Sequence, residues 1–207
     1  MSLTWEVFTG GFCQTNGYLL SLGGRHFLVD APDDSADWLR SRGVRVDALF
    51  LTHQHFDHVM DAARIAREHG CTIHAWTQPS PDLWLNKLFS GMTGWALDIE
   101  PYTVTHELAG VEQLHLGGLD FTVLHVPGHS PDSVCFHLPS DGVCFAGDTL
   151  FQDGVGRTDF PGGGAEILNR GIREKLYTLP DATRILPGHG GETTVGAEKT
   201  GNPFVRA

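Results

Sequence analysis

Basic residues are scarce in this chain. Its 207 residues include 14 Lys and Arg against 25 Asp and Glu, which gives a formal net charge of −11. Cationic side chains that neutralise phosphates supply most nucleic-acid affinity, so this balance argues against a nucleic-acid partner and against binding to a membrane surface. The count leaves out any bound cations, so one site can still be locally positive.

Cysteine is also rare, and the four residues (Cys13, Cys71, Cys135 and Cys144) show neither CxxC spacing nor the density of a secreted disulfide scaffold. A reducing compartment is therefore predicted. Cys135 and Cys144 are expected on neighbouring strands, where two reduced thiols are favoured over a bridge.

Long apolar runs are absent, since no stretch approaches the roughly 20 residues that span a bilayer. The first seven residues also lack a basic region followed by an apolar run. We therefore expect a cytoplasmic protein with no membrane partner. The apolar fraction of 41% and the charged fraction of 19% are ordinary for a globular protein, and we predict one domain over residues 1–207.

Strand and helix patterns occur in two similar blocks, which predict two sheets packed face to face with helices outside. In the first block, residues 18–22 and 25–30 form a hairpin through Gly23 and Gly24. The other expected strands are 5–8, 47–52, 72–76, 121–126, 133–138, 142–146 and 183–186, and the expected helices are 36–42, 61–69 and 165–177.

Residues 78–107 interrupt this pattern as an insertion rich in aromatic residues, with Trp84, Phe89 and Trp95. Two interpretations stand about equal. The segment is either a helical excursion that covers the sheets, or a substrate lid or dimer contact, because exposed aromatics on an insertion commonly serve recognition.

Three histidines and an aspartate fall within six positions, directly after a buried strand and before a helix: His53, His55, Asp57 and His58. Alternate positions such as His53 and His55 point to one side. Such a cluster is costly to bury without a cation, so it predicts a metal site. The isolated histidines, such as His26, His69, His74, His106 and His115, are interpreted as packed structural residues.

Three further segments, PGHSP, AGDTLF and PGHG, each follow an apolar strand and place a polar residue directly after a glycine. The polar residues are His129, Asp148 and His189. Each glycine permits a sharp turn that projects the next side chain from the sheet edge. One such dipeptide is a weak signal, whereas their order and placement at strand ends are jointly specific.

Together with THQHFDH, these motifs resemble the metallo-β-lactamase superfamily along nearly the whole chain, and within it the short form of glyoxalase II, the hydroxyacylglutathione hydrolases. The resemblance implies a four-layer αββα sandwich of two mixed sheets. It also implies that His53, His55 and His129 bind one metal, that Asp57, His58 and His189 bind a second, and that Asp148 bridges them.

These nitrogen and oxygen ligands favour two zinc ions and also admit iron or manganese. A hydroxide bridging the metals is the expected nucleophile on a small-molecule thioester, and Asp57 is expected to handle the proton. A thiolate leaves without much protonation, so no separate general acid is required. We expect a monomer or a homodimer.

Three less specific features surround the expected site. Asp30 either orients the ligand loop through hydrogen bonds or simply caps its strand. Arg157, together with free backbone N–H groups at Gly162 and Gly163, could bind an anionic substrate, although a flexible glycine turn is slightly favoured.

The chain ends at Ala207, soon after His189, whereas full-length glyoxalase II enzymes carry a further helical region that contacts glutathione, so those contacts cannot be transferred. Asp132 also stands where the family often has glycine. The alternatives are therefore an iron-dependent persulfide dioxygenase, which shares the segment 156–160, a lactonase, which shares the HxHFDH pattern, and an inactive metal-binding module. A β-lactamase is disfavoured because no export signal is seen.

Overall fold

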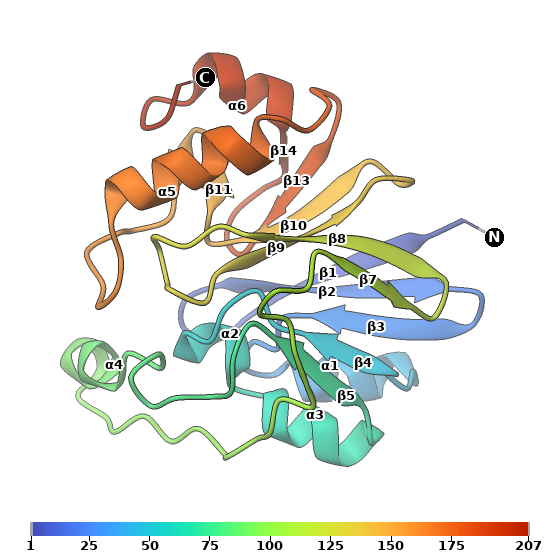
Figure 1. Cartoon of the computed structure of the whole chain (residues 1–207). Helices are drawn as coiled ribbons and strands as arrows, with labels where there is room; N and C mark the ends of the chain where they lie inside the picture. Colours follow the sequence, from blue (N-terminus) through green and yellow to red (C-terminus); the bar gives the residue numbers. More distant parts are fainter. Residues whose placement is uncertain (1, 207) are drawn as a thin grey trace. The chain divides into compact units, whose positions relative to one another are not determined.

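The computed structural model describes residues 2–206, and the chain divides into two compact units, Met1–Leu108 and Ala109–Ala207. Each unit contains a six-stranded mixed sheet with helices beside it (Figure 1). That the two units form a single domain stays a prediction. Within residues 2–206, every helix is too short or too polar to cross a bilayer.

The sheet of the first unit has the order β1-β2-β3-β4-β5-β6, with antiparallel pairs up to β3 and parallel pairs from there on. The predicted hairpin is confirmed, because Leu22 pairs with Arg25 and both Gly23 and Gly24 have positive φ. The strands are β1 Thr4–Gly10, β2 Thr15–Leu22, β3 Arg25–Val29, β4 Ala48–Phe50, β5 Thr72–Ala75 and β6 His106–Glu107.

Helices of the first unit are α1 Ser35–Arg42, α2 Phe56–Val59, α3 Ala62–His69 and α4 Asn86–Thr93. Leu39 of α1 and Ile65 of α3 share one core with Leu28 and Leu49 of the sheet, so these two helices cover a sheet face (Figure 1). α3 ends as predicted at Gly70, whose φ of 63° lets its N–H bond back to the carbonyl of Ala66.

The sheet of the second unit has the order β14-β13-β10-β9-β8-β7, in which only β10 and β13 pair in parallel. A separate hairpin, β11 with β12, follows β10. The strands are β7 Gln113–Leu116, β8 Leu119–His125, β9 Val134–Leu138, β10 Val143–Gly147, β11 Leu150–Phe151, β12 Gly154–Val155, β13 Arg184–Pro187 and β14 Thr193–Thr194.

The helical elements of the second unit are α5 Ala165–Gly171, the π-helical turn η1 Ile172–Leu176 and α6 Val195–Gly201. The single helix predicted for 165–177 therefore changes its hydrogen bonding midway, and the N–H of Tyr177 bonds to the carbonyl of Ile172. α5 and η1 pack Leu168 and Ile172 against Cys144 and Ile185 of the sheet.

Several short elements carry no periodicity that a sequence can reveal. β6, β11, β12 and β14 are two residues long, and α6 contains two glycines, which disfavour a helix. β6 lies inside the predicted insertion 78–107, yet it pairs with β5 and completes the first sheet. The last two residues of that segment therefore belong to the first sheet.

Within residues 2–206 no disulfide is formed, and Cys135 and Cys144 are reduced thiols, as favoured from the sequence. Cys135 and Cys144 lie on the adjacent strands β9 and β10, and both are fully buried. The hydrogen bond from Cys135, together with burial, raises the pKa of the Cys144 thiol. The Cys144 thiol therefore remains protonated, and both cysteines are buried parts of the core.

Candidate metal centre

The loop that follows β4 carries the first group of predicted ligands. β4 lies between β3 and β5 in the sheet, so its end is held on both sides. The rings of His53 and His55 are 4.6 Å apart between centroids, and those of His53 and His58 are 4.1 Å apart. All three histidines are buried, so this loop gathers three imidazoles in one place.

Gln54, between His53 and His55, holds the loop from its other side. Its side chain accepts a hydrogen bond from the hydroxyl of Tyr102 at 2.8 Å and donates one to the carbonyl of Thr77 at 3.1 Å. The expected alternation along this loop is therefore observed, with histidines on one side and the amide on the other.

Asp30 organises the histidine loop from the end of β3. Its carboxylate accepts hydrogen bonds from the N–H and the hydroxyl of Thr52, each at 2.8 Å, and from Nδ1 of His58 at 2.9 Å. The hydroxyl of Thr52 in turn lies 3.1 Å from Nδ1 of His53. Asp30 thus makes the contacts that an orienting residue needs, rather than only capping its strand.

Asp57 lies at the start of α2, beside His58. One carboxylate oxygen, Oδ2, accepts a hydrogen bond from the hydroxyl of Thr15 at 2.7 Å and lies 3.5 Å from Nε2 of His58. Thr15 is 42 residues away in the sequence, at the start of β2. No sequence motif indicated this contact.

Three strands of the second unit carry the remaining predicted ligands. β8 and β10 are both antiparallel to β9, and β13 is parallel to β10, so these three strands point the same way. The segments that follow them begin at one edge of the sheet and hold His129, Asp148 and His189. Asp148 Oδ2 lies 3.4 Å from Nε2 of His129 and 3.3 Å from Nε2 of His189.

Glycines next to these ligands allow the strand ends to turn. Gly128 has a φ of 132° and Gly147 a φ of 49°, both in the region that favours glycine. At His189 the glycine with positive φ is Gly190, which follows the ligand. The predicted turn therefore occurs in all three segments, although its glycine lies on the other side of His189.

The orientation of His129 depends on the chain after β12. Its Nδ1 lies 2.8 Å from the carbonyl oxygen of Arg157. A Cβ on Gly156 would collide with the carbonyl oxygen of Asp148 and come within 3.0 Å of His129 Nδ1. Residue 156 must therefore be glycine for the segment to pass this close to two predicted ligands.

These hydrogen bonds determine which nitrogen of each ring carries the proton. A carbonyl or a carboxylate can only accept, so His129 and His58 must donate from Nδ1, which leaves the Nε2 lone pair as the metal-binding group. Two ligands of one tetrahedral zinc are separated by roughly 3.3–3.6 Å, which matches the Nε2 to carboxylate distances of 3.3–3.5 Å in both groups. The residues therefore fit a metal.

The predicted substrate contacts have a different character. Arg157 is exposed, forms an ion pair with Asp159 at 2.7 Å and stacks on Phe160. The expectation of a free N–H group does not hold for Gly163, which donates a hydrogen bond to the carbonyl of Phe160 at 2.9 Å. Substrate binding at Arg157, Gly162 and Gly163 stays a prediction.

Histidines outside the two groups make ordinary structural contacts, as predicted. His69 Nδ1 accepts a hydrogen bond from the N–H of Val46 at 3.0 Å, and His74 stacks on His106 with centroids 4.5 Å apart. Burial, and the neighbouring His106, lower the pKa of His74 to about 4. Such a histidine remains neutral at ordinary pH.

Known proteins of one superfamily are similar to this chain along most of its length. A model of the metallo-beta-lactamase superfamily matches residues 10–189. The chain is 38% identical to the hydroxyacylglutathione hydrolase GloC of Haemophilus influenzae over 87% of each chain. It is 32% identical to the probable metallo-hydrolase YqgX of Bacillus subtilis over 98% of each chain.

Two solved structures share the fold. The B3 metallo-beta-lactamase BLEG-1 has a TM-score of 0.89 and 32% identity, and the match covers 99% of this chain and all of that one. TTHA1623 in a di-iron-bound form has a TM-score of 0.81 and 34% identity, over 97% of this chain and all of that one. The predicted fold and family resemblance are therefore confirmed.

Proposed function

Because the chain belongs to the metallo-beta-lactamase superfamily, we propose that it is a metal-dependent thioester hydrolase of the glyoxalase II type. The family and the curated relatives support the coarser statement that it is a metallo-hydrolase. The thioester assignment is supported by the similarity to GloC, which is named a hydroxyacylglutathione hydrolase.

The ligand assignment is part of this proposal. His53, His55 and His129 would bind one metal, Asp57, His58 and His189 the other, and Asp148 would bridge them. The observation that carries the proposal is the donor set itself: imidazole nitrogens with protons fixed on Nδ1 at His58 and His129, and carboxylate oxygens 3.3–3.5 Å from Nε2 atoms. No thiolate is included, so zinc, iron and manganese all suit the set.

When bound, such metals supply hydroxide near neutral pH and polarise an acyl carbonyl. The chain contributes the rest. Asp57 would accept the proton of the attacking water, and the hydroxyl of Thr15 holds one of its carboxylate oxygens in place. Asp30 and the Arg157 carbonyl hold the imidazoles of His58 and His129 in their metal-binding orientation.

A thioester suits this arrangement because its leaving group needs little help. A thiol has a pKa near 8.5, so the thiolate departs without a strong acid. The site therefore needs only a hydroxide nucleophile and a cation beside the acyl oxygen, which metals held by these residues would supply. An ordinary ester or amide would require protonation of a much more basic leaving group.

The test combines hydrolysis and metal content on one preparation. We expect protein loaded with zinc, iron or manganese to hydrolyse S-D-lactoylglutathione or simpler thioesters, and activity to rise with metal occupancy up to two ions per chain. Oxygen uptake and lactone hydrolysis are measured alongside. Turnover of a persulfide with oxygen uptake, or of lactones alone, would replace the thioester assignment.

A second candidate is β-lactam hydrolysis, which the similarity to BLEG-1 favours. A chromogenic cephalosporin distinguishes the two activities in the same metal-loaded preparation. We expect kcat/KM for the thioester to exceed that for the cephalosporin by at least about tenfold, a difference of about 1.4 kcal/mol in transition-state binding. The reverse ratio would make β-lactams the preferred substrate class.

A further inference from the structure

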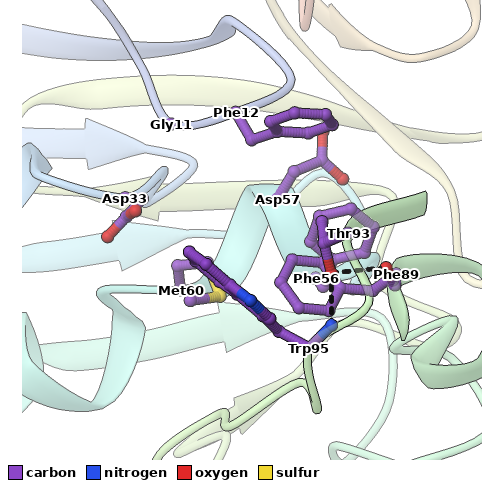
Figure 2. Close-up of a pocket in the computed structure, with 9 residues that line it drawn as sticks. All are labelled: Gly11, Phe12, Asp33, Phe56, Asp57, Met60, Phe89, Thr93 and Trp95. Atoms are coloured by element: carbon purple, nitrogen blue, oxygen red, sulfur yellow. Dashed lines mark hydrogen bonds between the residues drawn. The ribbon is translucent and has the colours of Figure 1, made fainter. Parts of the chain in front are cut away.

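A cavity of about 270 Å³ opens in the first unit next to the histidine loop. Figure 2 shows the residues that line it, which come from the turn between β1 and β2, from the segment before α1, from α2 with the residue after it, and from the segment around α4. Its size lies near the lower end of the range of roughly 300–1,000 Å³ for small-molecule sites. It can therefore hold one compact group rather than a whole tripeptide conjugate.

Asp57 links this cavity to the proposed reaction site. Its carboxylate lines the cavity and also belongs to the proposed ligand set beside His58. α2 places Phe56 and Asp57 next to each other in sequence, so the apolar wall begins one residue from a proposed ligand. A group in this cavity therefore adjoins the reacting centre.

The lining is apolar and aromatic, with Phe12, Phe56, Met60, Phe89 and Trp95. Phe56 and Phe89 pack edge to face with ring centroids 5.1 Å apart. The hydroxyl of Thr93 accepts a hydrogen bond from the backbone N–H of Trp95 at 3.1 Å (Figure 2). Phe12 is 68% exposed and Trp95 is 75% exposed. Large apolar side chains left exposed around a hollow commonly mark a recognition site.

The side chains of the lining disfavour the carboxylates of glutathione. Asp33 and Asp57 are its charged members, and among residues 2–206 no cationic side chain lines the cavity. The proposed metals would offset charge only at the Asp57 end, whereas the carboxylates of glutathione lie several bonds from the thioester. A carboxylate placed in the cavity would therefore lose hydration beside Asp33 and the aromatic side chains without a compensating cation. An uncharged acyl chain loses nothing and buries apolar surface.

We propose that this cavity binds the acyl group of the substrate, so that the enzyme selects thioesters of medium-length aliphatic or arylalkyl acids and leaves the thiol part toward solvent. This inference rests on the proposed thioesterase function and specifies its substrate class. The insertion around α4 then serves substrate recognition, one of the two roles considered from the sequence.

The test uses acyl chains of two to eight carbons on one thiol, N-acetylcysteamine, and a second series in which the thiol varies and the acyl group is butyryl. We expect kcat/KM to rise about two- to fourfold per methylene from acetyl to hexanoyl, and to vary little with the thiol. Trp95→Ala should reduce the hexanoyl-to-acetyl ratio about tenfold. Phe204→Ala, which truncates an aromatic residue 62% exposed outside the cavity, should leave the ratio unchanged.

Binding provides a readout that does not need turnover. S-alkyl thioethers of N-acetylcysteamine lack the thioester carbonyl and so cannot be hydrolysed. Calorimetry should show that Kd falls at least tenfold from the methyl to the hexyl thioether for the wild type, and much less for Trp95→Ala. If kcat/KM does not depend on acyl length, the inference that the cavity binds the acyl group is wrong, while the thioesterase proposal stands. If kcat/KM depends on the thiol instead, the cavity binds the thiol part of the substrate. If no thioester is hydrolysed, the thioesterase proposal fails and the thioether series alone decides whether the cavity binds alkyl groups.

Discussion

The two groups of proposed ligands are built in different ways. In the first unit, four ligands lie within six residues of one loop, and side chains hold them: Asp30 and Thr52 bond to the histidines. In the second unit, three ligands come from three strand ends between residues 129 and 189, and the backbone holds them through glycine turns and the carbonyl of Arg157. The orientation of the first group of ligands depends on hydrogen bonds from side chains, and that of the second group depends on the backbone conformation.

This difference predicts different sensitivities to mutation. Removing a side chain that orients the ligands of the first unit should lower their affinity for metal. The fold should stay intact, because the neighbouring strands still hold the loop. Adding a side chain where the backbone passes closely should disturb the second group together with the stability of its unit. The proposed bridging residue, Asp148, should be the most sensitive position of all.

Asp148→Ala tests the assembly of both groups and should have the largest effect. We expect loss of at least one metal and a decrease in kcat/KM of about 10³-fold or more, because the proposed bridge between the metals disappears. Elemental analysis and thioester hydrolysis measure the two effects. The exposed Asp141 provides the control Asp141→Ala. Full hydrolysis by Asp148→Ala with neither metal bound would disprove the mechanism.

Gly156→Ala tests the claim that chain path forms the second group. The added methyl would meet the carbonyl of Asp148, so we expect about 3 kcal/mol lower free energy of unfolding and weaker metal binding. Gly201→Ala places its methyl in open space in the same unit and should change stability by less than about 1 kcal/mol. Equal denaturation midpoints for the two variants would contradict the packing argument.

Asp30→Asn tests the role of side chains in the first group. Asparagine keeps the size of the residue and tolerates its positive φ of 59°, but it removes the negative charge of the group that accepts the hydrogen bond from Nδ1 of His58. We expect metal affinity to fall about 10- to 100-fold, with a small change in stability. Asp47→Asn, at an exposed position of the same unit, serves as the control. If metal affinity is unchanged in Asp30→Asn, Asp30 only caps its strand and does not support metal binding.

His74→Gln distinguishes a packed histidine from a ligand histidine in the same unit. In the folded wild type the pKa of His74 is about 4, below the ordinary value of 6.5. The unfolded chain therefore binds more protons between these pH values, and the free energy of unfolding falls as pH drops from about 6.5 to 4. We expect the variant to lose less stability over this range, by on the order of 2 kcal/mol. Urea denaturation of metal-free protein at pH 4.5 and 7 measures this. His115→Gln, at a side chain 72% exposed, should behave like the wild type.

Arg157→Ala should have the smallest effect on metal binding. The backbone carbonyl that orients His129 remains, and the lost ion pair with Asp159 is exposed, so solvent screens it and it contributes little. Metal affinity should therefore stay within about threefold of wild type. A larger loss would mean that the guanidinium, and not only the chain path, supports the second group.

The histidine loop could be predicted from sequence because its ligands are adjacent. His53 to His58 form a dense pattern after an apolar strand, and the structure places them there. Asp148 was recognisable only through its motif and family resemblance, since one Gly-Asp pair carries little information. Thr15 and Gly156 were missed because their roles depend on contacts with residues 57 and 148, which the local sequence does not reveal.

The sequence by itself indicated the two sheets through apolar periodicity and the types of ligand through the residues that follow each strand. It indicated the family through the resemblance of its motifs to those of known proteins. Only the tertiary structure decided which nitrogen of His58 and His129 is protonated, whether the N–H of Gly163 is free, and which residues line the cavity beside Asp57. Those properties depend on distances between residues far apart in the chain, and such distances are set by packing.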